Sequence, residues 1–252
     1  MTDSLGWRIK FGVVAPSTNT SVQPEYDDMR PRGVTNHFSR IMIPDDPVRS
    51  DEDFLALMHN IRGATEQAID AVMTCAPGYG VVLGMSAWRH VLGWRRGAEQ
   101  LHRRMEQRAG VSVRLRISHA VLEALKRYGS SIRRISVITP YMPVGDAMVR
   151  KFFEDNGYSI VALKGLKCAS PMLIAHETPN TLQAAIREVD GADVEAIVQV
   201  GTNLACAAVA ASAERWLDKP VIAINTATYW YALRQNGIVD RIEGFGSLLA
   251  DH

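Results

Sequence analysis

The sequence predicts an α/β fold in which helices cover parallel strands. Three observations predict it. Short apolar runs alternate with longer amphipathic runs along the whole chain, which is the pattern of a parallel sheet with helical connections. The 252 residues are enough for one large α/β domain or two small ones with a sizeable core. No linker rich in proline and serine divides the chain, so any division into halves has to be found in repeated motifs.

The apolar runs predict the strands, because each is short and rich in residues that favour a pleated sheet. In chain order they are Ile9–Ala15, Thr35–Ile43, Val81–Leu83, Val111–Arg116, Ile135–Thr139, Ser159–Leu163, Ala196–Val200 and Val221–Ile224. The amphipathic stretches predict the helices Asp51–Thr74, Trp88–Arg108, His119–Tyr128, Val144–Asn156, Asn180–Val189, Leu204–Leu217 and Ala227–Gln235. Two of these segments, Ser118–Gly129 and Thr226–Gly237, begin with a hydroxyl residue that can cap a helix and end with glycine.

The composition argues against some classes of binding partner. Lys and Arg number 28 against 27 Asp and Glu, a formal net charge of +1 that favours neither nucleic acid nor an anionic membrane. No apolar run approaches the roughly 20 residues of a membrane span, and the first residues lack the apolar core of a signal peptide. We therefore expect a cytoplasmic protein. The three cysteines, Cys75, Cys168 and Cys206, lack the spacing of a disulfide framework or a zinc site.

Three strand-to-helix corners recur in the same order in the two parts of the chain. Ala-Pro-Ser is repeated as Thr-Pro-Tyr, Gly-Met-Ser as Gly-Thr-Asn, and Ser-His-Ala as Thr-Ala-Thr. The repeat predicts two similar halves, residues 1–117 and 118–225, with residues 226–252 crossing back to the first half. Ligands of open parallel sheets bind beyond the carboxyl ends of the strands, so six polar corners should surround one cleft. Backbone amides at helix N-termini favour an anion there, and we expect the cleft to hold one or two carboxylates.

The motif GVVAPSTNTSVQPEY at the start and GTNL near residue 201 resemble those of the aspartate/glutamate racemase superfamily, in the branch of maleate cis-trans isomerases and arylmalonate decarboxylases. The resemblance covers roughly residues 9–240. It implies two αβ subdomains related by pseudo-twofold symmetry, with the active site in the cleft between them. It also implies that no cofactor or metal is used, that the substrate is a small carboxylate or dicarboxylate, and that the protein self-associates.

The chain departs from the family at the two central corners. Racemases and maleate isomerases carry a cysteine at each corner, whereas this chain has Gly84 and Gly201. The distance from Gly201 to Pro220 matches the family spacing from the cysteine to the proline before the next strand, which supports this alignment. Arylmalonate decarboxylases also have glycine at the first corner, but they keep the second cysteine as a proton donor. We therefore expect backbone donors rather than sulfur at the site.

The resemblance and the corners together predict the site residues. The expected substrate-binding residues are Pro16, Ser17, Asn19, Gly84, Met85, Ser86, Trp88, Gly201, Thr202 and Asn203. Tyr141 matches the family tyrosine that contacts a substrate carboxylate, and it is the first candidate for the missing acid. His119, after the third corner, is the second candidate. Cys168 remains an alternative thiol, whereas Cys206 is read as a small core residue.

Loss of both family cysteines removes the chemistry of two-base racemisation and of covalent isomerisation. Decarboxylation still needs only a desolvated carboxylate, donors for the developing enediolate and some source of a proton. The leading prediction is therefore a cofactor-independent lyase, most specifically an arylmalonate-type decarboxylase. Two alternatives stay open. One is a cis-trans isomerase or racemase of a small dicarboxylate that uses acids other than cysteine, and the other is a carboxylate-binding protein without catalysis.

Overall fold

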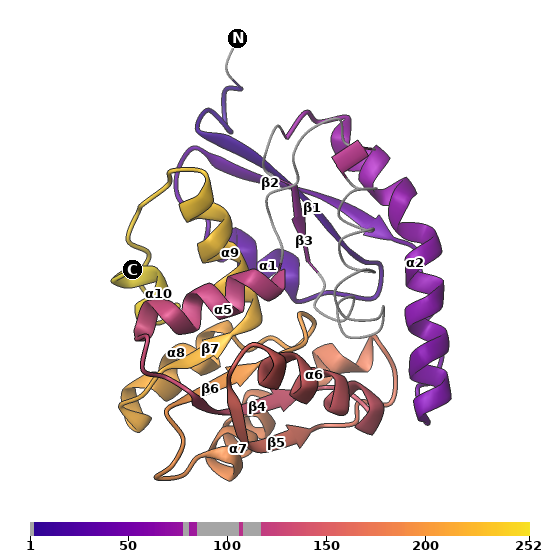
Figure 1. The fold of residues 1–252 in the computed structure, drawn as a ribbon. Helices are drawn as coiled ribbons and strands as arrows, with labels where there is room; N and C mark the ends of the chain where they lie inside the picture. The colour runs from indigo at the N-terminus through magenta and orange to yellow at the C-terminus, as the bar shows by residue number, and fades with distance from the viewer. Residues whose placement is uncertain (1–2, 78–80, 85–105, 108–116) are drawn as a thin grey trace.

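The computed structural model describes residues 3–77, 81–84, 106–107 and 117–252. Its strands form two parallel sheets, one above the other in Figure 1. The first sheet has the order β2-β1-β3 and the second the order β5-β4-β6-β7. The strands are β1 (Ile9–Pro16), β2 (Val34–Ile41), β3 (Val81–Leu83), β4 (Arg134–Thr139), β5 (Ser159–Gly165), β6 (Ala196–Gln199) and β7 (Val221–Ala223). The predicted α/β class with parallel sheets is confirmed.

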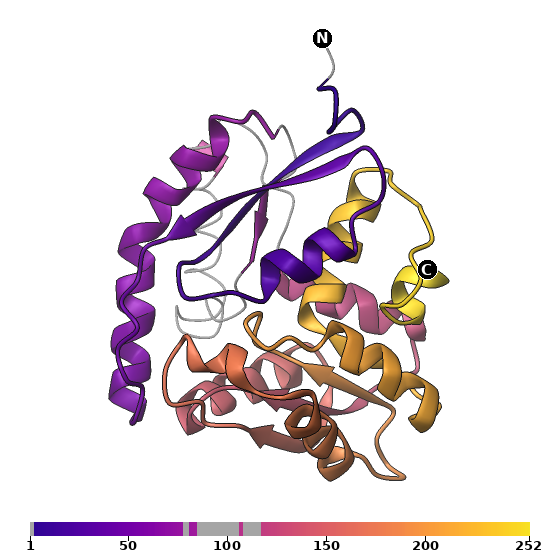
Figure 2. The ribbon, with the colours of Figure 1, turned by 180° about the vertical axis from the view of Figure 1, so that it is seen from behind.

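Helices surround both sheets, and Figure 2 shows them from behind. They are α1 (Val22–Asp28), α2 (Asp51–Met73), α5 (Ile117–Tyr128), α6 (Pro143–Asp155), α7 (Pro179–Val189), α8 (Ala207–Leu217), α9 (Ile224–Gln235) and α10 (Ser247–Ala250), with a 3-10 turn η1 (Leu173–His176). Helices α1, α5 and α9 lie between the two sheets (Figure 1).

Most predicted elements are confirmed, with shifts at their ends. Helix α8 begins at Ala207 rather than Leu204, because the residues after β6 first form a turn in which the Leu204 amide donates to the Gly201 carbonyl at 3.1 Å. Helix α9 begins at Ile224, three residues before the predicted start. The short elements α1, η1 and α10, which have seven, four and four residues, were not predicted. The predicted helix Trp88–Arg108 lies almost entirely outside the described residues, and the predicted strand Val111–Arg116 lies wholly outside them.

The long helix α2 runs along one side of the molecule, and it contacts β1 and β2 of the first sheet and α6 beside the second (Figure 1). Its start is fixed by a capping box, in which Ser50 Oγ accepts from the Asp53 amide at 3.2 Å and the Asp53 carboxylate accepts from the Ser50 amide at 3.1 Å. Asp51 then accepts from the amide of Val144 at the start of α6, at 3.0 Å. The first turns of α2 are therefore attached to the half of the protein that holds the second sheet.

Helix α9 follows β7 of the second sheet but packs against the first. Its Tyr229 is fully buried, and the ring centroid lies 5.8 Å from that of Phe11 on β1 and 4.8 Å from that of Tyr26 on α1. The Tyr229 hydroxyl donates to Asn36 Oδ1 on β2 at 3.0 Å. Aromatic packing of this kind adds to the energy of area burial and joins the two sheets into one core.

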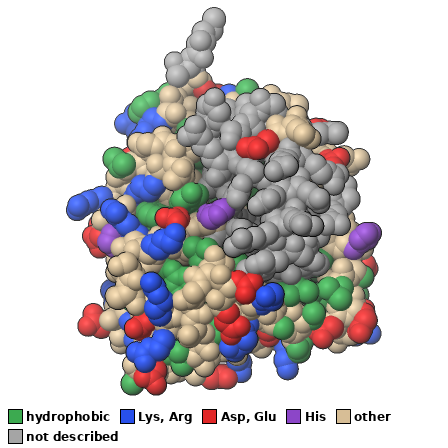
Figure 3. All heavy atoms as spheres, viewed as in Figure 1, with side chains coloured by type: hydrophobic (Ala, Val, Ile, Leu, Met, Phe, Trp, Pro, Cys, Tyr) green, Lys and Arg blue, Asp and Glu red, His purple; other side chains and the backbone are tan. Residues whose placement is uncertain are grey.

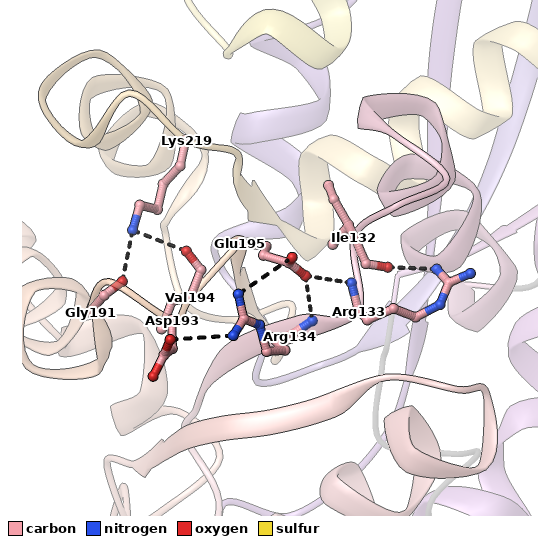
Figure 4. Close-up of polar contacts among 8 residues, drawn as sticks. All are labelled: Ile132, Arg133, Arg134, Gly191, Asp193, Val194, Glu195 and Lys219. Carbon is pink, nitrogen blue, oxygen red and sulfur yellow. Dashed lines mark hydrogen bonds and ion pairs between the residues drawn. The ribbon is translucent and has the colours of Figure 1, made fainter.

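Polar contacts hold the amino ends of the second sheet's strands (Figure 4). The Glu195 carboxylate, just before β6, accepts the amides of Arg133 and Arg134 at 2.7 Å each. Lys219, just before β7, donates to the carbonyls of Gly191 and Val194 at 3.1 Å each. These contacts lie at the edge of the sheet opposite to the carboxyl ends, so they support the sheet without entering the candidate site.

Charged side chains of both signs are interspersed on the face that Figure 3 shows. Lys and Arg lie among Asp and Glu there, as expected for a formal net charge of +1. Within the described ranges, no helix combines the length and the apolar character that crossing a bilayer requires.

Candidate functional site

A cavity of about 80 Å³ lies at the carboxyl ends of strands from both sheets. The segment after β1 contributes Pro16, Thr18 and Asn19. From the second sheet, the segment after β4 contributes Pro140 and Tyr141, the segment after β5 contributes Cys168 and Ser170, and that after β6 contributes residues 201–203. Parallel strands end at the same edge of a sheet, which is why residues far apart in the sequence meet here.

One wall of the cavity is apolar. Helix α2 supplies Phe54, Leu57, Met58 and Ile61, whose spacing places them on one face of the helix. Ile43, Val48 and Ile174 extend this wall. The ring of Phe54 also packs against that of Tyr141, with centroids 5.4 Å apart. A wall of this kind excludes water and fits an apolar substituent of a ligand.

Other lining residues carry backbone donors. Thr18, Gly201, Thr202 and Asn203 all line the cavity, and within the described part of the chain none of their four amides has a hydrogen-bond acceptor. Residues 201–203 are buried. Buried amides are nearly always paired in folded proteins, so this cluster is suited to an anionic acceptor such as a carboxylate.

Side chains from three corners are bonded to one another. Asn19 Nδ2 donates to Thr202 Oγ1 at 3.0 Å, and Thr202 Oγ1 donates to the Gly84 carbonyl at 3.0 Å. Asn203 accepts from the Thr20 amide at 2.9 Å and donates to the Pro171 carbonyl at 2.9 Å. The polar side chains of Asn19, Thr202 and Asn203 therefore fix the two halves together, and the amides are the groups left to bind a ligand.

Gly201 has a conformation that excludes a side chain. Its φ is +109°, a region that residues other than glycine rarely adopt. A Cβ atom built at this position would lie 2.5 Å from Cδ of Pro140, well inside van der Waals contact. The backbone conformation of Gly201 is therefore incompatible with a cysteine at this corner.

Gly84 differs from Gly201. Its φ is not positive, but a Cβ atom there would lie 3.2–3.3 Å from side chains of Val13, Ala15 and Val22. Its amide donates to the Val14 carbonyl at 2.8 Å, and its carbonyl accepts from Thr202. The lack of a side chain at Gly84 thus lets the corner after β3 pack closely against β1 and Thr202. Gly84 is not among the described residues that line the cavity.

The remaining predicted site residues lie in different places. Pro16 and Tyr141 line the cavity. The Ser17 amide donates a hydrogen bond to the Ile41 carbonyl at 2.8 Å, and its hydroxyl is hydrogen-bonded to the backbone of Ile43 at 3.1 Å. Both groups therefore bind the end of β2 and the segment after it. His119 lies on α5 and is not among the described residues lining the cavity. Met85, Ser86 and Trp88 lie outside the described residues.

The expectation of a crevice without sulfur is wrong in one respect, because Cys168 lines the cavity. The residue is 8% exposed, its amide donates to the Pro140 carbonyl at 3.0 Å, and its Sγ donates to Glu177 Oε1 at 3.5 Å. Burial, followed by the nearby charge of Glu177, raises the pKa of the thiol to about 12. Cys168 is therefore a protonated thiol at neutral pH.

The location of this thiol has a structural reason. The ring of Pro140 lies close to Gly201, and the Pro140 carbonyl accepts a hydrogen bond from the amide of Cys168. Cys168 follows β5, which pairs with β4, and Gly201 follows β6 on the other side of β4. The thiol thus comes from the end of the strand on the opposite side of β4. Cys206 is 1% exposed at the N-cap of α8 and is not a lining residue within the described ranges.

The apolar wall on α2 was not predicted from the sequence. Its spacing of three and four residues is equally typical of any helix packed on a core, so periodicity alone cannot separate a cavity wall from core. The described residues contain no group of three or more His, Cys, Asp and Glu side chains with the arrangement of a metal site.

Comparison with known proteins agrees with this architecture. A family model described as arylmalonate decarboxylase matches residues 57–249. No individual curated protein sequence matches the chain.

Solved structures resemble the whole fold. The maleate cis-trans isomerase of Nocardia farcinica, in a mutant form with a covalently bound succinylcysteine intermediate, is 21% identical with a TM-score of 0.83, covering 97% of this chain and 99% of that one. The maleate isomerase of Pseudomonas putida is 18% identical with a TM-score of 0.82, covering 96% and 98%. An arylmalonate decarboxylase is 17% identical with a TM-score of 0.69, covering 95% and 98%. The extent of the family match shows that the chain belongs to the arylmalonate decarboxylase family.

Proposed function

We propose that the protein decarboxylates an arylmalonate-type acid without a cofactor. The observation that carries this proposal is that one cavity is lined both by the apolar face of α2 and by Thr18 and residues 201–203, whose amides have no acceptor among the described residues. A malonate with an aromatic or alkyl substituent offers both a carboxylate for the amides and an apolar group for Phe54 and Leu57. Maleate offers two carboxylates and no apolar substituent, so it fits these walls less well.

The chemistry follows from the same two walls. One carboxylate binds the amides, and the other lies against the apolar wall, where it loses its hydration. Loss of carbon dioxide breaks the bond between the second carboxylate and the central carbon, and the electron pair spreads onto the remaining carboxylate as an enediolate. The amides then face more negative charge than in the ground state, which is the condition for catalysis. One such donor contributes about 10²–10³-fold to the rate in well-studied enzymes.

Cys168 is the proton donor in this proposal. Its pKa of about 12 keeps the thiol protonated while substrate binds. An enediolate is far more basic at carbon than a thiolate, so transfer of the proton is downhill. The S–H bond breaks, a C–H bond forms, and the thiolate takes a proton from water before the next turnover. Tyr141 lines the same cavity and, in this reading, contacts the carboxylate.

Purified protein assayed with 2-methyl-2-phenylmalonate tests the proposal. We expect release of carbon dioxide and one enantiomer of 2-phenylpropionate, which carries a single deuteron at carbon 2 when the reaction runs in D₂O. Maleate serves as the comparison substrate. Conversion of maleate to fumarate with no turnover of arylmalonates would contradict the proposal and favour an isomerase. Binding of these acids without any product would favour a carboxylate-binding protein.

Three variants test the donor. Cys168→Ala should slow turnover and yield racemic product, because solvent then protonates both faces of the enediolate. Cys75→Ser removes a thiol that is not among the described lining residues, and it should leave the product a single enantiomer. Tyr141→Phe should raise KM and keep stereocontrol. A single enantiomer from Cys168→Ala together with racemic product from Tyr141→Phe would assign the proton to Tyr141 instead.

The organisation of the chain remains part of the proposal. We infer that residues 1–117 and 118–225 are two halves related by pseudo-twofold symmetry, with residues 226–252 crossing back. The packing of Tyr229 on Phe11 supports the crossing. We also propose that the protein self-associates, as the family resemblance implies.

A further inference from the structure

Glu25 makes a set of contacts that the proposed reaction does not use. The residue lies on α1 and is half-buried overall, but its carboxylate group is buried. One carboxylate oxygen accepts from the Ala207 amide, the first residue of α8, at 2.8 Å. The other accepts from Asn225 Nδ2, in the first turn of α9, at 2.6 Å. A single carboxylate thus joins one helix near the first sheet to two helices that follow strands of the second.

The contacts continue to the wall of the cavity. Asn225 Nδ2 has two protons, and the second one is donated to the Thr202 carbonyl at 2.9 Å. Thr202 is the middle residue of the corner 201–203 that lines the cavity. Ala207, held by the other oxygen of Glu25, lies four residues after Asn203 on the same segment of chain. Glu25 therefore contacts this segment in two ways. It accepts directly from the Ala207 amide at the start of α8, and through Asn225 it is linked to the Thr202 carbonyl.

We propose that Glu25 and Asn225 position the anion-binding amides of Gly201, Thr202 and Asn203. A carboxylate-binding wall works only if its donors point in fixed directions before the ligand arrives. Peptide groups are planar, so fixing the Thr202 carbonyl also fixes the orientation of the Asn203 amide. This inference rests on the proposed function for the nature of the ligand, but the positioning itself is a property of the free protein.

The site favours a carboxylate over an amide side chain at position 25. The groups that face it are donors: the Ala207 amide, the Cys206 amide and Asn225 Nδ2. Glutamine would turn an NH₂ group toward one of these donors. The other ionisable groups that face Glu25 are Tyr26 and Asp28 on α1 and the Cys206 thiol at the start of α8. Burial is the main cause that raises the pKa of Glu25 to about 7, and the three donors oppose the rise.

The first measurement is amide hydrogen exchange of Leu204, whose amide is bonded to the Gly201 carbonyl within the corner. We expect Glu25→Gln and Asn225→Ala to speed exchange of Leu204 by roughly tenfold, because each change leaves a buried partner unpaired. Asp28→Asn removes the same charge from an exposed position on the same helix and should leave exchange of Leu204 unchanged. Exchange in α7 (Pro179–Val189) serves as a check that the variants are folded.

The second measurement is the affinity for phenylacetate, the monocarboxylate that an arylmalonate would yield. Both variants should raise its Kd roughly tenfold, and the double variant should raise it by less than the product of the two effects, because the residues act in one chain of contacts. A variant with faster exchange only at Ala207, unchanged exchange at Leu204 and unchanged affinity would overturn the proposal. Failure of the wild-type protein to bind phenylacetate would count against the proposed function, whereas exchange of Leu204 would still decide the positioning role.

Discussion

Replacing Gly201 by alanine should destabilise the protein severely, for two separable reasons. The residue has φ +109°, and holding a residue with a side chain in a sparsely populated region costs about 1–3 kcal/mol. The new methyl group would lie 2.5 Å from Cδ of Pro140, and overpacking of this kind costs about 1–3 kcal/mol more. We therefore expect a loss of about 4 kcal/mol in the free energy of unfolding.

Two further variants separate the causes. Gly157 also has a positive φ, +84°, but a Cβ atom there meets nothing within 4 Å. Gly157→Ala should thus lose only the backbone contribution, about 1–2 kcal/mol. Pro140→Ala removes the ring that blocks position 201, so the double variant Gly201→Ala, Pro140→Ala should be less destabilised than the sum of the two single variants.

Urea unfolding monitored by circular dichroism measures each loss, and thermal unfolding should show Gly201→Ala lower by roughly 10 °C in Tm. The same reasoning predicts that Gly201→Cys does not restore a family-type thiol, because the Cβ atom rather than the sulfur causes the conflict. The reasoning is refuted if Gly201→Ala costs no more than Gly157→Ala. It is equally refuted if Gly201→Cys is as stable as the wild type and more active.

Three other predictions follow from the site and the fold. Phe54→Ala should raise KM for 2-methyl-2-phenylmalonate and leave KM for methylmalonate nearly unchanged, because only the aryl group needs the apolar wall of α2. The pKa of Glu25 is raised in the folded protein from 4.5 to about 7, so the wild type should gain up to about 3 kcal/mol relative to Glu25→Gln as pH falls from 8 to 4.5. A constant difference between the two unfolding free energies over that range would contradict the burial of this carboxylate. Arg8→Ala should cost about 1 kcal/mol or less, and less still at high salt, because its ion pair with Asp240 is partly exposed; an effect that salt does not change would contradict this.

The sequence was sufficient to predict the alternation of strands and helices, because that pattern depends on local periodicity. It was also sufficient to show that no cysteine stands at Gly84 or Gly201. Helices of seven residues or fewer were missed, as with α1, since a short helix such as Val22–Asp28 lacks enough turns to produce a period.

The partners of individual side chains required the tertiary structure. Asn19 and Thr202 are 183 residues apart, and nothing local indicates that they bond to each other instead of to a ligand. Cys168 follows β5, whereas the central corners at Gly84 and Gly201 follow β3 and β6. Its place in the cavity depends on β5 and β4 ending side by side. Glu25 lies on α1, and nothing in the neighbouring sequence indicates that its carboxylate holds the first turns of α8 and α9.

The sequence by itself determined the fold class, the family and the absence of sulfur at the two central corners, because these depend on residue identity and on periods of two to four residues. Only the tertiary structure decided which donors remain for a ligand, which thiol lines the cavity and which wall is apolar. These properties depend on how the carboxyl ends of separate strands meet, and that meeting is set by packing between residues more than a hundred positions apart.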